Sequence, residues 1–547
     1  MATIFKSEDI NYFLTRSQEV LLTSEQGDKL ASKQNVVFKR GEAKGNVISV
    51  RPDIVKQTLL GIGTSFTESS AFVLAHLNEP DRSKVMHQIF SDSGANFSMA
   101  RTPVGACDFC VEGQYSYDDV KGDAQLLHFS IANDQDGFDT EKYPGIRDKN
   151  FDLLPMIQQA LDIKSGQKDS ELKIIASAWT APAWMKDIED WYQPGRAENN
   201  FNGSGGVLKP QYQKTYADYL IRYLSAYRQQ GVDIWGITPV NEPLGNNGQW
   251  ESMHFTAESQ NLFIKNCLGP KLQQSNNESV RLLVFDHSRD QLEQWADVIY
   301  TDNDTASYVS GAAVHWYESS YKVFEEVFDR VHDKYPDFSI IHTEGCIDDL
   351  GNDAPNGVLD PQGFKESNWF DNDSFWWNDN ASDWGYSVTW PGVNVDDHPM
   401  YTPVHRYARN IIVSLNHWVT GWIDWNIVLD QRGDPNHVGN YCGAPIMIDV
   451  STDYVYYTPV FYVLAQLSRT IRPGDKAVET ETFLLLEAQN VIFTCATINT
   501  DNLLTVQVLN TSKKAVDYML QVGQHYAAVT IIANSLQTIR IQMPTPG

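Results

Sequence analysis

The stretch YQKTYADYLIRYLSAYRQQGVDIWGITPVNEP (212–243) contains one helix and one strand of a unit that repeats along the chain. Residues at helical spacing place one face of 212–231 against a core, namely Tyr216, Leu220, Tyr223, Leu224 and Tyr227. Gly231 ends this helix. The run IWGITPV (234–240) follows directly and is typical of a buried strand, which Pro243 closes because proline lacks a backbone N–H. The stretch therefore predicts a helix that leads into a parallel strand.

Seven further apolar runs of this kind alternate with helical segments between about residues 57 and 428. With 234–240, the predicted strands are TLLGIG (58–63), NFSMART (96–102), KIIASAW (173–179), RLLVFD (281–286), GAAVHWY (311–317), SIIHTE (339–344) and GWIDWNIVL (421–429). Strands that alternate with helices indicate βαβ units and a parallel sheet. Eight is the number that closes a (β/α)₈ TIM barrel, so we expect that fold.

The two ends of the chain have a different pattern. Short strand-like runs recur every 10–12 residues after a last helix near 455–469, namely FLLLEA (483–488), VIFTCATI (491–498), LLTVQVLN (503–510), DYMLQVG (517–523) and AVTIIA (528–533). Similar pieces, NVVFKR and NVISVRP, occur within 10–55. We therefore predict an all-β sandwich built from both termini, with 1–56 as its N-terminal part, 57–453 as the catalytic barrel and 454–547 as the last helix and C-terminal sandwich.

A long insertion at about 345–400 follows the predicted seventh barrel strand. It is rich in Asn, Asp and Gly and carries five tryptophans, Trp369, Trp376, Trp377, Trp384 and Trp390. Loops of this length are usually functional or disordered, and the tryptophans argue against disorder. Three interpretations stay open: a wall of the substrate cleft, a self-packed lid, or an oligomer contact. Calcium binding is not expected, because the EF-hand spacing is absent.

The charge of the chain restricts its partners. Its 547 residues carry a net charge of −28, which disfavours nucleic acid and anionic lipid as partners. The N-terminal residues lack the pattern of a cleaved secretory signal, and the six cysteines do not suggest a disulfide framework. We therefore expect a cytoplasmic protein, or one exported without a cleaved signal. The histidines form no metal-binding motif, so neither a metal nor another cofactor is expected.

Two carboxylates occur at the carboxyl ends of predicted barrel strands, where such barrels place their active sites. Glu242 follows the fourth strand and Glu344 ends the seventh. A pair of carboxyls across one barrel mouth is what glycoside hydrolysis requires: one gives a proton to the leaving oxygen and the other attacks the anomeric carbon. This placement predicts a glycoside hydrolase. A retaining mechanism requires the two carboxyls to lie about 5–5.5 Å apart, a distance that the sequence does not give.

Aromatic and amide residues obey the same strand-end rule. Trp179 ends the third predicted strand, three consecutive residues end the sixth, and two lie in the eighth: His315, Trp316, Tyr317, Trp425 and Asn426. Each fits core packing, and together they also fit a platform for a sugar, which uses apolar faces and directed hydrogen bonds.

The chain resembles glycoside hydrolase family 30, and within it the lysosomal glucosylceramidase branch. The motifs that carry this resemblance occur in family order over about 57–475: GIGTSFTESSAFVLAHL (61–77), RTPVGACDFC (101–110), SAWTAPAWMK (177–186), ITPVNEP (237–243), AVHWY (313–317), HTEGC (342–346), VTGWIDWNIVLDQRGDPNHVGNYCGAPIMID (419–449) and YVYYTPVFYVLAQLSRTIRPG (454–474). The family fold, a (β/α)₈ barrel with a β-sandwich from both chain ends, agrees with the pattern above.

The resemblance implies a role for ten residues. Glu242 would be the general acid/base and Glu344 the nucleophile of a double displacement with net retention, and Asn241 would bind the sugar 2-hydroxyl. The other hydroxyls of a terminal glucose would be held by Asp108, Trp179, Trp425 and Asn440. The nucleophile region would be contacted or oriented by His315 and Tyr317 and supported by Arg101.

The resemblance also implies the substrate, glucosylceramide or a related β-glucoside. The alternatives are another specificity of the family, an endo-β-1,6-glucanase or a β-xylosidase, and a non-catalytic relative that binds glycan or lipid. A lipid substrate would require a transient contact with a membrane surface through a local apolar patch, and the sequence does not indicate whether an activator protein takes part. The insertion is longer than the corresponding loop of the lysosomal enzyme, which leaves the aglycone open.

Overall fold

The computed structural model describes residues 16–193, 205–245, 249–275, 277–347, 369–379, 399 and 402–544. Eight parallel strands close into a barrel, in the order β10-β11-β12-β5-β6-β7-β8-β9. Their bounds are β5 (Gly61–Ser65), β6 (Met99–Pro103), β7 (Lys173–Ser177), β8 (Gly236–Thr238), β9 (Arg281–Ser288), β10 (Val309–His315), β11 (Ser339–Glu344) and β12 (Val419–Ile423). The predicted eight-stranded TIM barrel is confirmed.

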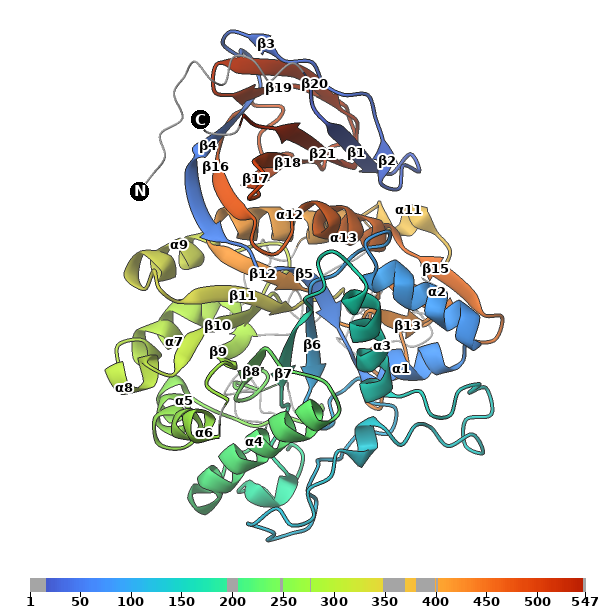
Figure 1. Cartoon of the computed structure of the whole chain (residues 1–547), viewed down its shortest axis with the longest axis vertical. Helices are drawn as coiled ribbons and strands as arrows, with labels where there is room; N and C mark the ends of the chain where they lie inside the picture. The colour runs from blue at the N-terminus through green and yellow to red at the C-terminus, as the bar shows by residue number, and fades with distance from the viewer. Residues whose placement is uncertain are drawn as a thin grey trace.

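Helices are arranged around the barrel (Figure 1). They are α1 (Glu68–Ala75), α2 (Glu79–Phe90), α3 (Leu153–Ser165), α4 (Gln213–Gln229), α5 (Ala257–Phe263), α6 (Gly269–Gln274), α7 (Leu292–Ile299), α8 (Asn303–Ala306), α9 (Glu325–Lys334), α11 (Asp373–Trp376), α12 (Pro403–Asn416) and α13 (Pro459–Thr470). The predicted helical face of 212–231 is buried in α4, and Gly231 follows its end with φ of +80°. No helix in the described part of the chain is both long and apolar enough to cross a membrane.

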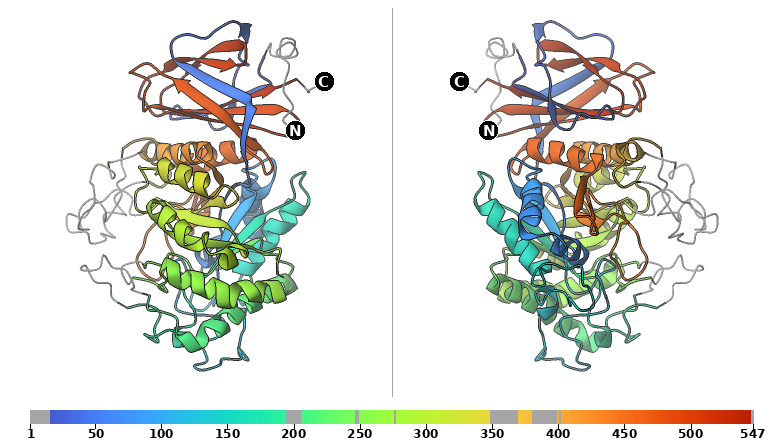
Figure 2. Two further views of the ribbon diagram at one scale, coloured as in Figure 1. Left: turned by 90° about the vertical axis from the view of Figure 1, so that its left-hand side faces the viewer. Right: turned by 90° about the vertical axis from the view of Figure 1, so that its right-hand side faces the viewer.

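Both chain ends form one ten-stranded sheet that closes over its own core and lies beside α12 and α13 (Figures 1 and 2). Its N-terminal strands are β1 (Glu19–Ser24), β2 (Ala31–Ser32), β3 (Lys39–Arg40) and β4 (Val47–Thr58). The C-terminal strands are β16 (Lys476–Phe483), β17 (Ile492–Ile498), β18 (Leu503–Asn510), β19 (Val516–Val522), β20 (His525–Ile531) and β21 (Ser535–Gln542). Because β1 pairs with β21 and β4 pairs with β16 and β19, the predicted sandwich of both termini is confirmed. The domain boundaries that we drew remain predictions.

The structure corrects two predicted strands. Of the run FLLLEA (483–488), Phe483 is the last residue of β16, and 484–488 lie in the turn that follows, in which Ala488 N–H donates to Leu485 O at 2.9 Å. The strand before it, KAVETETF, contains few apolar residues and buries only Ala477 and Val478 in the core, so an apolar run did not mark it. The eighth barrel strand ends at Ile423, and Trp425 and Asn426 follow it instead of lying within it. Asn426 has φ of +56°, a backbone conformation incompatible with a continuing strand.

A small third sheet, which was not predicted, follows the barrel. It consists of β13 (Val428–Asp430), β14 (Ile446–Asp449) and β15 (Tyr454–Tyr457). The loop between β13 and β14 contains Asn440, so this sheet fixes both ends of a segment that faces the barrel mouth.

Candidate active site

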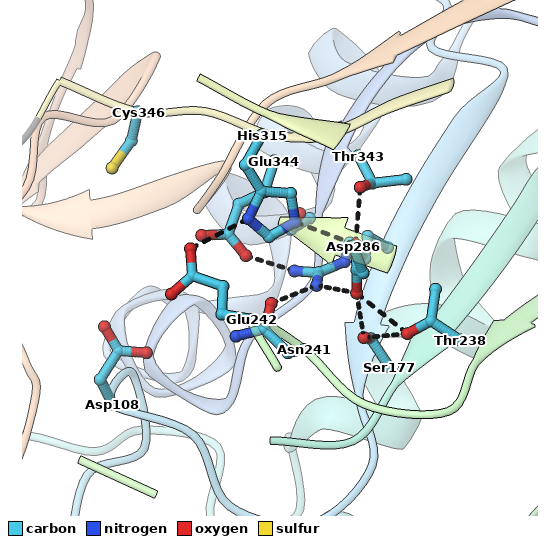
Figure 3. Close-up of polar contacts among 12 residues, drawn as sticks. Asp108, Ser177, Thr238, Asn241, Glu242, Asp286, His315, Thr343, Glu344 and Cys346 are labelled. Atoms are coloured by element: carbon cyan, nitrogen blue, oxygen red, sulfur yellow. Dashed lines mark hydrogen bonds and ion pairs between the residues drawn. The ribbon is translucent and has the colours of Figure 1, made fainter. Parts of the chain in front are cut away.

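Glu242 and Glu344 meet at the carboxyl ends of β8 and β11 (Figure 3). Side-chain ligand atoms of Glu242, His315 and Glu344 all lie within 4.8 Å of one another. Glu344 is buried and Glu242 is partly exposed. Retaining glycosidases place their two carboxyls about 5–5.5 Å apart, whereas inverting ones leave room for a water between them. The separation thus fits a double displacement.

Arg101, at the centre of β6, binds the nucleophile candidate directly. Its Nη1 forms an ion pair with Glu344 Oε2, and its Nη2 donates to Asn241 Oδ1 at 2.6 Å and to Asp286 Oδ2 at 2.9 Å. The guanidinium is fully buried; burial lowers its pKa, but the charges of Asp286 and Glu344 outweigh this and raise it above its usual range. Arg101 therefore brings a permanent positive charge to the site.

Asp286 is the centre of the hydrogen-bond network beneath the two glutamates, and the sequence analysis did not identify it. It accepts hydrogen bonds from five side chains: Arg101, Ser177 (2.5 Å), Thr238 (2.9 Å), His315 (2.9 Å) and Thr343 (2.8 Å). Burial raises the pKa of Asp286, but Arg101, His315 and the hydrogen bonds hold it far below the usual range. The carboxylate is therefore a permanent anion.

A break in the barrel register gives Asp286 its position. Phe285 and Asp286 have φ of +74° and +63°, and the pairing of β9 with β10 shifts by one residue there. A second shift lies between Val314 and His315, where β10 pairs with β11. Bulges redirect side chains near active sites, which here brings Asp286 and Thr343 to the same point. Asp286 ends the run RLLVFD, so the strand-end rule that selected Glu242 contained the signal for it.

His315 connects the network to Glu242. Its Nδ1 lies 3.0 Å from Glu242 Oε1 and its Nε2 lies 2.9 Å from Asp286 Oδ1. Since both ring nitrogens face carboxylates, both carry a proton. Burial opposes this charge, but Glu344, Asp286 and the two hydrogen bonds raise the pKa of His315 to about 9. The resemblance implied that His315 contacts or orients the nucleophile region; the structure gives it hydrogen-bond distances to Glu242 and Asp286 and places its ring within 4.8 Å of the Glu344 carboxyl.

The two glutamates have pKa values shifted in opposite directions. For Glu242, burial raises the pKa, but the hydrogen bond and charge of His315 outweigh it, so the value lies below its usual range. For Glu344, burial and the charge of Glu242 raise the pKa above its usual range against His315 and Arg101. Because ionisation of one carboxyl opposes that of the other, the pair holds one proton more tightly than an isolated carboxyl does.

Two buried indoles lie against Arg101 beside the pair and form what we call the sugar wall. Trp179 and Trp425 stack with ring centroids 5.3 Å apart, and the Arg101 guanidinium carbon lies 4.8 Å from the Trp179 ring centroid. Asp108 accepts a hydrogen bond from Asn440 Nδ2 at 3.0 Å, and burial together with the charge of Glu344 raises the pKa of Asp108 to about 8. A neutral carboxyl here can both donate to and accept from sugar hydroxyls. The Tyr317 hydroxyl lies 3.5 Å from Cys346 Sγ, and its ring centroid lies 6.0 Å from that of His315.

The loop 430–443 presents Asn440 and is held on three sides. His437 Nε2 lies 3.1 Å from a carboxylate oxygen of the buried Glu251. The His437 ring also packs closely on Gly113, where an added Cβ would lie 2.3 Å from Nε2. Beneath the loop, Trp369 of the insertion donates to Gln431 O at 3.0 Å. Trp369, Trp376 and Trp377 are buried, and Trp369 stacks on Trp376. This part of the insertion supports the sugar wall; Trp384 and Trp390 lie outside the described residues.

Known families account for most of the chain. The glycosyl hydrolase family 30 TIM-barrel domain matches residues 59–357 and 385–471, and the β-sandwich domain of the same family matches 486–539. The chain belongs to glycosyl hydrolase family 30. It is therefore a glycoside hydrolase of a retaining family, as the sequence predicted.

Several known proteins are similar to this chain over most of its length. Putative glucosylceramidase 4 of Caenorhabditis elegans is 26% identical, with 96% of this chain and 89% of the worm protein covered. Mouse lysosomal acid glucosylceramidase is 29% identical, with 86% and 78% covered. Two solved structures share the fold over 96% of this chain and 99% of theirs: SrfJ from Salmonella typhimurium (TM-score 0.75, 23% identity) and an endo-β1,6-glucanase (TM-score 0.71, 24% identity).

Within this family 30 site, Asp286 is a positioning residue, and Asp286→Asn is the variant that tests it. We expect kcat/KM to fall about 100-fold, because Arg101 and His315 both lose an anchor and misplacement of catalytic groups by about 1 Å has an effect of this size. Removal of one partner from a buried ion pair also destabilises, so we expect a loss of about 3 kcal/mol in the free energy of unfolding.

The pH dependence of stability separates this effect from a general loss of packing. His315 has a folded pKa of about 9 and an ordinary value of 6.5, so its stabilisation is complete below pH 6.5 and is lost as pH rises through 9. In Asp286→Asn, we expect the fall in Tm between pH 6.5 and 9 to become shallower than in the wild type. Asp297→Asn, at a partly exposed carboxylate paired with Lys334, is the matched control. An unchanged slope in Asp286→Asn would contradict the assigned role.

Proposed function

We propose that the protein is a retaining β-glucosidase that hydrolyses glucosylceramide or a related β-glucoside. The observation that carries this proposal is the close pair Glu242 and Glu344, with Glu344 paired to Arg101 and Glu242 to His315. The stacked Trp179 and Trp425 and the Asp108–Asn440 pair fit a single terminal glucose beside it. The names of the worm and mouse relatives support a glucosylceramide substrate.

In the first step, the Glu344 carboxylate attacks the anomeric carbon and Glu242 protonates the leaving oxygen. A covalent bond forms between Glu344 and glucose as the glycosidic bond breaks, and the aglycone departs with the proton. Asn241, fixed by Arg101 at 2.6 Å, binds the 2-hydroxyl, where hydrogen bonds strengthen in the transition state. In the second step, Glu242 takes a proton from a water molecule whose oxygen attacks the anomeric carbon. The bond between that carbon and Glu344 breaks, Glu344 leaves as a carboxylate, and glucose is released with its anomeric configuration retained.

The division of roles follows from the permanent charges around the two glutamates. In the unliganded site the pKa of Glu344 is raised and that of Glu242 is lowered, whereas the first step requires a proton on Glu242. The two carboxyls are close enough to exchange a proton when the glycosidic oxygen binds beside Glu242, and Arg101 stabilises the Glu344 anion. His315 in turn stabilises the Glu242 anion that remains after proton donation. Esterification of Glu344 removes its negative charge, which lowers the pKa of Glu242. Glu242 is then ionised, as its role as the base in the second step requires.

A substrate panel tests the specificity. We expect hydrolysis of glucosylceramide, presented in neutral phosphatidylcholine vesicles because the −28 chain repels anionic lipid, and of aryl β-glucosides. Each reaction is followed by chromatography of its products, with β-1,6-glucan and xylo-oligosaccharides as the competing substrates. Cleavage of only the glucan or the xylan would replace the proposal with one of the other family specificities. Binding without cleavage of any β-glycoside would favour a non-catalytic relative.

A further inference from the structure

Two thiols lie in contact beside the active site, and nothing in the mechanism above uses them. Cys346 is two residues after Glu344, and Cys442 is two residues after Asn440. Their Sγ atoms are 3.5 Å apart, and both side chains are buried. Glu344 is the last residue of β11, so Cys346 follows that strand at the end where the two glutamates lie (Figure 3). The pair therefore joins the loop after the nucleophile to the loop that presents a glucose contact.

The backbone holds the two loops in a fixed arrangement. Gly443 N–H donates to Ile347 O at 2.7 Å, directly next to the thiols. Trp316 Nε1 donates to Cys346 O at 3.1 Å, and Cys442 N–H donates to Gly433 O at 3.2 Å. A disulfide has an S–S length of about 2.05 Å, so the two sulfurs have to approach by roughly 1.5 Å. A shift of that size is within reach of side-chain rotation and a small loop movement.

We propose that Cys346 and Cys442 form an oxidation site, which a peroxide converts to an intramolecular disulfide that reversibly lowers hydrolysis. The Cys346 thiolate attacks one peroxide oxygen; the O–O bond breaks, hydroxide leaves, and a sulfenic acid forms. Cys442 then attacks this sulfur, the S–O bond breaks, and water leaves as the S–S bond forms. In total, two thiols and one hydrogen peroxide give one disulfide and two waters, with sulfur oxidised and peroxide reduced. The order of attack can be reversed without change in the product.

The effect on activity rests on the proposed function. Catalytic groups have to be held within about 0.5 Å of their productive positions. A link that draws Cys346 and Cys442 together acts two residues away from both Glu344 and Asn440, at opposite sides of the glucose site. We therefore expect kcat/KM of the oxidised protein to be at least about 10-fold lower, a size expected for sub-ångström misplacement.

The experiment treats the full chain with hydrogen peroxide and measures two quantities. Peptide mass spectrometry, with and without reduction before digestion, detects the Cys346–Cys442 link independently of activity. Hydrolysis of an aryl β-glucoside is measured before oxidation, after oxidation and after dithiothreitol. We expect the link to appear as activity falls and both to reverse with the reductant. A link without loss of activity would overturn the switch, and no link at any peroxide concentration would overturn the site.

Matched variants identify the responsible thiols, with the ratio of oxidised to reduced activity as the readout in each. Cys442→Ser and Cys442→Ala are both made, so that a folding defect in one leaves the other; each should lose the response. The control is Cys110→Ser, because Cys110 Sγ lies 3.4 Å from the Cys107 amide in a second thiol pair close to Asp108. Loss of the response in Cys110→Ser, with the response retained in the Cys442 variants, would overturn the proposal. If the panel identifies another glycoside, the same oxidation test applies to that substrate, so the two proposals fail separately.

Discussion

Glu344→Gln is expected to lower kcat/KM for an aryl β-glucoside by about 10⁴-fold or more, which corresponds to at least about 5.5 kcal/mol of transition-state stabilisation. The amide cannot form the covalent glycosyl intermediate, yet its oxygen can still accept the Arg101 hydrogen bond, so we expect the fold to persist. Steady-state kinetics measure the loss, and Tm compares the stability of the two proteins.

Covalent labelling identifies the nucleophile directly. The fluorine of a 2-deoxy-2-fluoro-β-glucoside slows both steps, and a good leaving group restores the rate of the first step. The glycosyl-enzyme intermediate therefore accumulates. We expect the label on the peptide that contains Glu344, and no label in Glu344→Gln. Glu326→Gln, at an exposed glutamate in α9, is the matched control. Label on any other residue, or full activity in Glu344→Gln, would contradict the assignment.

Glu242→Gln is expected to have an effect that depends on the leaving group. General acid catalysis contributes about 10²–10⁴-fold, so a substrate with a poor leaving group should lose activity in that range. Dinitrophenolate leaves without protonation, so the first step with a dinitrophenyl glucoside should be nearly unchanged. The measurement is a burst experiment with both substrates, which separates formation of the intermediate from its hydrolysis.

Chemical rescue provides the control for Glu242. In Glu242→Ala, azide can enter the vacated space and attack the intermediate without a general base, and we expect β-glucosyl azide as the product. The same treatment should not rescue Glu344→Gln, because no intermediate forms there. An equal loss with both leaving groups, or formation of the α-azide, would show that Glu242 does not act as the acid/base.

Much of the site could be predicted because parallel strands bring their carboxyl ends to the same edge of a barrel. Glu242 and Glu344 were found from this rule alone, although 102 residues separate them (344 − 242). Trp179 and His315 were found in the same way. The rule specifies a common edge and gives no contacts, so it did not reveal that His315 bonds Glu242 while Arg101 pairs with Glu344.

Asp286 ends a predicted strand, but the strand pattern does not give the direction of its side chain. Alternation along β9 predicts on which face each side chain lies, but two consecutive residues with positive φ break that alternation. The bulge depends on how β9 pairs with β10, and nothing in RLLVFD itself signals it. The early end of β12 before Trp425 and the exposed run FLLLEA were mispredicted for a related reason: the apolar content of a run does not specify where a strand begins or ends.

The sequence by itself determined the barrel, the sandwich from both termini, the family and the two glutamates, because each of these leaves a periodic or local mark in the chain. Only the tertiary structure decided the network around Asp286, the proton balance between Glu242 and Glu344, and the contact between Cys346 and Cys442. These depend on distances of a few ångströms between residues far apart in sequence. Closure of the barrel and the shifts in its strand register set those distances, and the pKa values follow from the burial and the charges that closure brings together.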